Sequence, residues 1–167
     1  STAGAEALAL AAPLANLATV ELQLDLLDEA TGHARQAITI LRRTPASSPV
    51  AQVRAWVILG RIRGRAGDVS GAIEALRAAG ALAERDPNVD RLTAAQAHEA
   101  MMQVLVEGIP ADDRPLQRVL YDGNVAAGKA VRALEQHFGP ASPELAPALD
   151  SVATWYQLTG QDDDEIG

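Results

Sequence analysis

The feature that most constrains this chain is an internal repeat with a period of 42 residues. Six pairs of chemically similar residues recur at this offset. The pairs are Leu17 and Leu59, Ala18 and Gly60, Leu27 and Val69, Ala30 and Ala72, Ala37 and Ala79, and Pro45 and Pro87. Repeats of this length are typical of proteins whose small structural units stack side by side and share one core. The chain is therefore expected to be an array of similar units.

The units are expected to be helical. Apolar periodicity, interrupted by Pro, Gly and Asp, predicts seven helices and no strand, at residues 5–24, 27–43, 50–66, 69–85, 93–107, 115–137 and 144–159. Asp68 is expected to cap the fourth helix, and Thr93 with Gln96 resembles a capping box for the fifth. Aromatic residues make up only 3% of the chain, which suits helix pairs packed through Leu, Ile, Val and Ala.

The second repeat resembles a tetratricopeptide repeat. Trp56, Leu59 and Gly60 have its W-x2-L-G spacing, and the later positions Gly67, Ala72, Ala79 and Pro87 follow the same pattern. The long connection between repeats is similar to that of kinesin-light-chain repeats. The resemblance implies an all-α fold, a right-handed α-solenoid of about seven antiparallel helices, made of three helix pairs and one terminal helix. We expect one domain, 1–167, with repeats near 5–45, 50–87, 93–138 and 144–167, the third containing an insertion at 108–116.

One position departs from the family pattern. Arg63 stands where these repeats usually carry a tyrosine, and its counterpart one period earlier is Glu21. Equivalent positions in adjacent repeats are neighbours, so a half-buried Glu21–Arg63 ion pair is expected, because neither charge should be buried alone. The alternative is that both side chains extend to water.

A stripe of cations on the third helix is the candidate binding site. Arg54, Ile58, Arg61 and Arg65 advance by four, three and four residues, which places them on one helix face, opposite Trp56 and the core. The resemblance implies that this face lines a concave groove. Guanidinium groups bind carboxylates in a bidentate manner and remain charged. The neighbouring groove surfaces are expected to include Asn16, Thr19, Gln23, Thr154 and Gln157; the alternative is a solvated basic face.

The distribution of charge agrees with an acidic ligand at the centre of the chain. The net charge is -8, yet residues 33–91 carry ten arginines against five acids, whereas the segments on both sides are acidic. A basic middle attracts anionic partners. We therefore expect an acidic protein or peptide partner, bound through an acidic segment or a free C-terminal carboxylate.

The sequence gives little support to catalysis, metal binding or nucleic-acid binding. His33, His98 and His137 lie on different predicted helices without ligand spacing, so no metal or cofactor is expected. The acids Asp112, Asp113 and 162–165 are expected to be solvated, and the glycines of 60–67 follow no strand as a phosphate loop requires. Nucleic-acid binding is disfavoured because the chain is acidic and lacks interleaved aromatics. No catalytic residue is proposed.

Further expectations concern the location and source of the protein and whether the chain is part of a longer one. The apolar segment near the N-terminus is interrupted by Pro13 and Asn16 and follows no basic residue, so it is interpreted as a helix and not as a membrane anchor or signal peptide. This favours the cytoplasm, and the thirteen arginines against one lysine suggest a bacterial source. The last predicted helix has no partner helix after it, so either this helix is a natural cap or the chain is part of a longer protein. The chain ends where the next helix should begin, which favours the longer protein. Alternative functions are self-association through terminal helices, or a sensor or recruitment module of that larger protein.

Overall fold

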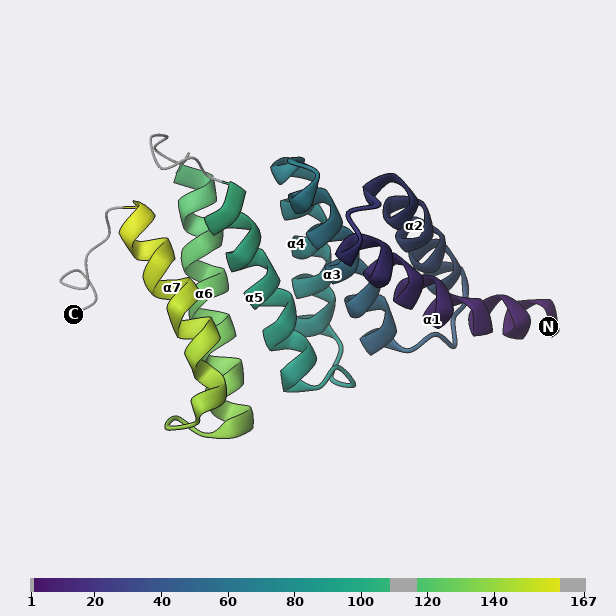
Figure 1. The fold of residues 1–167 in the computed structure, drawn as a ribbon. Coiled ribbons are helices and arrows are strands. Elements are labelled where there is room, and N and C mark those ends of the chain that lie inside the picture. Colours follow the sequence, from purple (N-terminus) through teal and green to yellow (C-terminus); the bar gives the residue numbers. More distant parts are fainter. Residues whose placement is uncertain (1, 109–116, 160–167) are drawn as a thin grey trace.

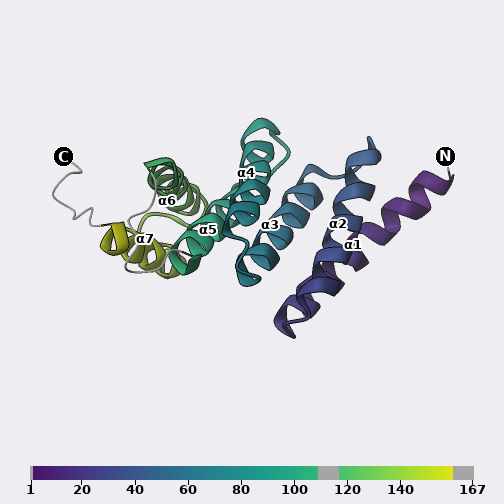
Figure 2. The same cartoon turned by 90° about the horizontal axis from the view of Figure 1, so that it is seen from above.

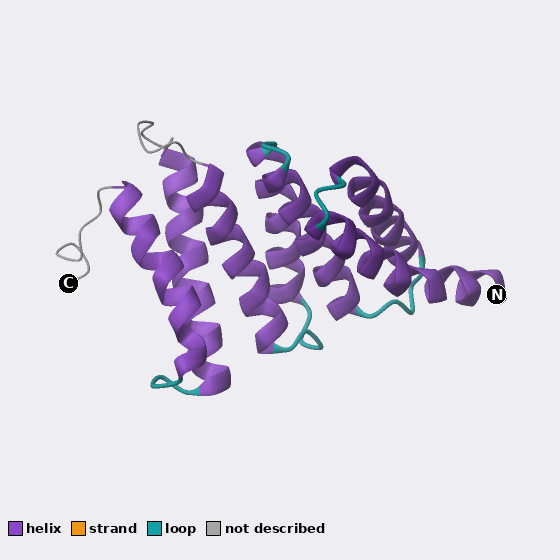
Figure 3. Cartoon of the chain, in the orientation of Figure 1, coloured by secondary structure: helices purple, strands orange, loops and turns teal. Residues whose placement is uncertain are grey.

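The computed structural model describes residues 2–108 and 117–159, and within them it is all-α. The described residues form seven α-helices and one short 3-10 helix, and no strand occurs among them (Figure 3). The elements are α1 (Thr2–Gln23), α2 (Leu27–Arg43), α3 (Pro49–Arg65), α4 (Val69–Arg85), α5 (Arg91–Gly108), α6 (Gln117–Phe138), η1 (Pro143–Leu145) and α7 (Ala146–Thr159). The all-α class and the number of helices predicted from the sequence are confirmed.

The helix ends follow from local capping chemistry. Ser48 accepts a hydrogen bond from the Ala51 N–H at the start of α3, where Pro49 occupies the first turn and needs no partner for its missing N–H. Asp68 caps α4 by accepting from the Gly71 N–H at 2.9 Å, as predicted. Gly67 precedes it with a positive φ of 79°, which glycine adopts without steric cost.

The predicted capping box at the start of the fifth helix is wrong. The helix begins at Arg91, so Thr93 lies inside its first turn and Asp90 supplies the cap. Asp90 Oδ1 accepts from the Thr93 N–H at 2.9 Å, and Oδ2 accepts from Thr93 Oγ1 at 2.8 Å. Aspartate is a strong capping residue, and its charge is favourable beside the partly positive N-terminus of a helix, so it displaces threonine from this role.

The helices form a row of hairpins in chain order, with α1 and α7 at opposite ends of the row (Figure 1). The closest packing joins α1 with α2, α3 with α4, and α5 with α6. Each odd-numbered helix also contacts the next odd-numbered helix along the row. Seen from above, α5 and α7 lie on one side of the row and α4 and α6 on the other (Figure 2). The odd-numbered helices thus form a continuous layer along one side of the row. We call it the inner layer.

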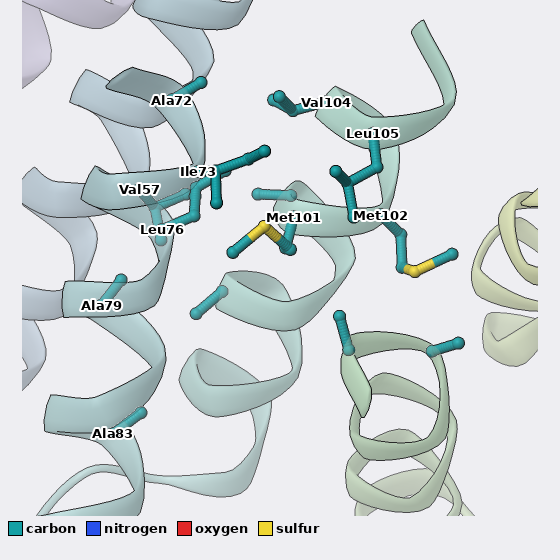
Figure 4. Packing of buried hydrophobic residues seen from close by; sticks show 14 of the residues in the cluster. Val57, Ala72, Ile73, Leu76, Ala79, Ala83, Met101, Met102, Val104 and Leu105 are labelled. Atoms are coloured by element: carbon teal, nitrogen blue, oxygen red, sulfur yellow. The ribbon is translucent and has the colours of Figure 1, made fainter. Parts of the chain in front are cut away.

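The core runs along the row in clusters built from small and aliphatic residues. The largest cluster contains residues from each helix from α3 through α7. It includes Ile73 and Leu76 of α4, which lie near Met101 of α5 (Figure 4). A second cluster joins α1, α2, α3 and α4 through Ala18, Ala34 and other residues. Small side chains let the helix backbones approach closely, as the alanine and glycine positions of the repeat predict.

The outer side of the second and third hairpins is connected by polar interactions. Arg77 forms an ion pair with Asp122, and Lys129 Nζ lies 2.5 Å from Glu84 Oε1, so both pairs link α4 to α6. We call these two ion pairs the outer strap. Their residues are seven apart on each helix, because positions two helical turns apart lie on one helix face. Within the third hairpin, Arg91 donates to the backbone oxygen of Gln136, at 3.5 Å.

Helix α1 packs one of its faces against the core. This face buries Ala11 and Ala18 in the second cluster. Among the described residues, the segment Gly4–Gln23 of α1 is the one long and apolar enough to cross a membrane by length and composition. The same criterion is met by core helices of soluble proteins and by signal sequences. Length and composition are therefore weak evidence that α1 crosses a membrane.

Candidate functional site

Helix α3 presents the predicted cation stripe away from its packed face. Arg54, Arg61 and Arg65 are exposed and Ile58 is half-buried. On the opposite side, Gly60 approaches Leu76 of α4 so closely that a Cβ placed on Gly60 would lie 2.5 Å from Leu76 Cγ. Because the packed face of α3 is fixed by this contact, the arginines are turned toward the neighbouring inner helices.

The first hollow lies between α3 and α5 and has a volume of about 280 Å³. Arg54, Ile58 and Arg61 line it from α3, together with the buried side chains of Val53 and Val57. Its α5 wall consists of Thr93, Gln96 and Glu99. The hollow therefore combines an apolar floor, two cations on one wall and a carboxylate on the other.

The second hollow lies between α1, α3 and α5 and has a volume of about 350 Å³. Arg61 and Arg65 line it from α3, and Gln23 with Leu22 lines it from α1. Helix α5 contributes Gln103, Val104 and Glu107. Arg61 lines both hollows, so the two are adjacent along α3. We call the two hollows together the inner groove.

The three arginines of the stripe differ in their partners. Arg65 Nε lies 3.2 Å from Asp25 Oδ1. The N–H and Oγ1 of Thr93 hold the pKa of Asp90 below its ordinary value by hydrogen bonding, and the charge of Arg54 lowers that pKa further. With the residues that the structure describes, Arg54 and Arg61 make neither an ion pair nor a hydrogen bond through their side chains. Of these two, Arg61 lines both hollows, so it is the arginine that a ligand in either hollow would meet.

The remaining predicted groove residues divide into two sets. Gln23 lines the second hollow, whereas Asn16, Thr19, Thr154 and Gln157 line neither of the two hollows. Asn16 and Gln157 are exposed on α1 and α7. The hydroxyl groups of Thr19 and Thr154 donate to backbone oxygens one turn earlier in their own helices, at 3.0 and 2.8 Å. The structure therefore gathers Arg54, Ile58, Arg61, Arg65 and Gln23 at the inner groove and leaves the other four outside it.

The sequence analysis missed the wall that α5 contributes. Gln96, Glu99, Gln103 and Glu107 advance by three, four and four residues, which is the spacing of one helix face. Gln96, Gln103 and Glu107 are exposed and Glu99 is half-buried. The same periodicity argument that found the arginine stripe would have found this polar stripe, which the structure places opposite the arginines.

The expected Glu21–Arg63 ion pair is wrong. Glu21 is buried, with Oε2 at 2.8 Å from His33 Nδ1 on the partner helix of its own hairpin. Arg63 donates to the backbone oxygen of Gly71 at 2.9 Å and lies 3.9 Å from Asp68. Each charge therefore finds a partner within its own hairpin, where the turn brings polar groups close. The underlying expectation, that neither charge is buried alone, is confirmed.

The three histidines occupy separate environments. His98 is largely buried next to Gly80, and its Nε2 lies 3.6 Å from Glu84. Burial lowers the pKa of His98, Glu84 opposes that shift, and Lys129 adds to it. His33 contacts Glu21, and His137 stacks edge-on against Phe138. In residues 2–108 and 117–159 no group of three His, Asp or Glu residues is placed to hold a metal ion.

Several predicted features lie outside the described residues. These are the inserted segment at 109–116, with Asp112 and Asp113, and the acidic run at 162–165.

Comparisons of the chain with protein-family models, with curated proteins and with solved structures found no match. The interpretation of the inner groove therefore depends on its geometry and charge.

Proposed function

We propose that this chain is a non-enzymatic scaffold of the tetratricopeptide type that binds a peptide or protein segment in the inner groove. The observation that carries the proposal is the position of Arg61, an exposed guanidinium without a partner among the described residues, at the junction of two hollows. A guanidinium binds a carboxylate through two parallel hydrogen bonds. Val57 and Ile58 supply an apolar surface beside it. The proposed ligand feature is a carboxylate next to an apolar side chain.

The tetratricopeptide assignment rests on the sequence pattern and agrees with the packing of α3 and α4. Gly60 and Leu76 are in close contact, and Ala72 and Ala79 are fully buried, as the small positions of that repeat require. The same proposal takes the inner layer of odd-numbered helices as the concave side of a right-handed solenoid. It involves neither cofactor nor nucleic acid, and it places the protein in the cytoplasm of a bacterium, with α1 as a packing helix.

The proposal is tested by exchanging the charge at Arg61. We expect Arg61→Glu to abolish binding of acidic peptides without loss of thermal stability, because the side chain is exposed. Arg42→Glu on α2 is a matched control, since Arg42 is also an exposed helical arginine but lines none of the hollows described here. Peptide binding is measured by fluorescence anisotropy.

Ionic strength gives a second readout of the same experiment. A solvent-exposed ion pair is worth only about 0.2–1 kcal/mol, and charge-assisted hydrogen bonds in a partly enclosed site about 1.5–3 kcal/mol. Binding should therefore weaken as salt rises, but less steeply than for a fully exposed contact. Binding of basic peptides, or binding that ignores both salt and Arg61, would show that the arginine stripe is a solvated face.

Self-association is the second candidate function, and the outer face of α1 favours it. Leu10 and Leu17 of α1 and Leu24, directly after the helix, are spaced by seven residues and are 57%, 43% and 64% exposed. Leu10 also lines a hollow of about 440 Å³ together with Leu14, Ile40, Arg35, Gln36 and Thr39. Contiguous exposed apolar surface commonly marks a contact site.

Sedimentation of the protein over a range of concentrations tests self-association. If α1 mediates it, the mass should rise with concentration, and Leu17→Glu should hold the protein as a monomer. Ala12→Glu introduces the same charge at an exposed position on another face of α1 and serves as the control for helix integrity. A monomer at every concentration would eliminate this candidate and leave the inner groove as the functional surface.

A further inference from the structure

The two walls of the inner groove carry opposite charges. Arg54 and Arg61 of α3 line the first hollow on one side, and Glu99 of α5 lines it on the other. No ion pair joins Glu99 to either arginine. With the described residues Glu99 makes neither an ion pair nor a side-chain hydrogen bond, and the same is true of Arg54 and Arg61. The hollow thus contains two cations and one anion that form no ion pair with each other.

Such an arrangement restricts the charge of a ligand that fills the hollow. In the free protein, water solvates both groups. A ligand that excludes this water must supply an opposite charge to each, because a desolvated charge without a partner is costly. A uniformly acidic segment would satisfy Arg61 but would place negative charge against Glu99, and like charges in an interface select against such a partner.

The second hollow has a different polar character. Arg65 is already held by Asp25, and Glu107 Oε1 accepts a hydrogen bond from Gln103 Nε2 at 3.0 Å. The charges at this end are thus largely satisfied within the protein. Gln23 and Gln103 also line it, and a glutamine amide can both donate to and accept from a peptide backbone. Charge selection is therefore concentrated in the first hollow.

Building on the proposed function, we infer that the bound segment is of mixed charge. It carries an acidic side chain that pairs with Arg61, a basic side chain that pairs with Glu99, and an apolar side chain between them on Val57 and Ile58. The opposed walls make the groove selective against segments that contain acids alone. This changes the class of partner from an acidic tail to a segment in which acid, apolar residue and base are close together.

An array of short random-sequence peptides tests the inference. The peptides are acetylated and amidated so that terminal charges do not contribute. With the wild-type protein, peptides containing both an acid and a base should be enriched over peptides containing acids alone. Glu99→Gln should weaken binding of a selected mixed-charge peptide by about fivefold, the scale of one exposed ion pair, and should strengthen binding of all-acidic peptides.

A matched variant controls for the loss of a carboxylate elsewhere. Glu74 is an exposed glutamate on α4 and does not line the inner groove, so Glu74→Gln should leave both peptide classes unchanged. If the wild type prefers all-acidic peptides through Arg61 and Glu99→Gln has no effect, the mixed-charge inference is wrong and the proposed function stands. If no peptide depends on Arg61, both are wrong.

Discussion

Replacing Trp155 by alanine is expected to lower the free energy of unfolding by about 3–5 kcal/mol, the range for removing a large aromatic side chain from a core. Trp155 of α7 is fully buried, and its Nε1 donates to Asn124 Oδ1 at 2.8 Å. Its ring lies so close to Gly123 of α6 that a Cβ there would be 2.1 Å from Trp155 Cζ2. The substitution leaves a cavity where α6 and α7 meet. Chemical denaturation followed by far-ultraviolet circular dichroism measures the change.

Two comparisons show whether the effect comes from burial. Tyr121 of α6 is 69% exposed, so Tyr121→Ala should change the free energy of unfolding by less than about 0.5 kcal/mol. Trp56 is only half-buried, so Trp56→Ala should cost less than Trp155→Ala. A loss at Trp155 no larger than that at Tyr121 would contradict the packing of α7 against α6.

Replacing Gly60 by leucine is expected to destabilise the protein by about 1–3 kcal/mol through overpacking. A Cβ at this position would lie 2.5 Å from Leu76 Cγ and 2.8 Å from Leu76 Cδ2. Leu76 is itself buried in the core, so the two helices must move apart. Differential scanning calorimetry compares the variant with the wild type.

The matched control uses the exposed glycine of α2. A Cβ added at Gly32 would meet no atom within 4 Å, and glycine is a poor helix former, so Gly32→Leu should be neutral or stabilising, by up to about 0.5–1 kcal/mol. Equal destabilisation by both leucines would mean that the close approach of α3 and α4 is not what makes Gly60 necessary.

The fold was predictable because its signals are local or periodic. Pro49, Gly67 and Asp68 mark helix ends by their own chemistry, and the small residues at Gly60 and Ala72 mark the close approach of two helices. The predicted cap of the fifth helix was wrong because Asp90 and Thr93 are both residue types that cap helices. Only the three-dimensional geometry shows which of them precedes the first turn.

The inner groove was only partly predictable. The arginine stripe follows from spacing within one helix, whereas the identity of the facing wall depends on how α3 and α5 pack. The spacing of residues within α5 marks its polar stripe, and Gln103 stands one 42-residue period after Arg61. Only the packing of the helices shows that Glu99 lies across the first hollow from Arg54 and Arg61. Partner choice by Glu21 and Arg63 also depends on which polar groups the turns bring near, and sequence spacing does not contain that information.

The outer strap determines how the row of hairpins can bend. On the inner side, α3, α5 and α7 are joined by direct packing, so separating them would expose apolar surface to water. On the outer side, α4 and α6 are joined through Arg77, Asp122, Glu84 and Lys129, which are partly exposed and therefore screened by salt. Motions that open the outer side cost less than motions that open the inner side. The easiest deformation of this part of the array is therefore expected to open the outer side and draw the walls of the inner groove together. Under the proposed function, bending of the array and closure around a bound segment would then be the same movement.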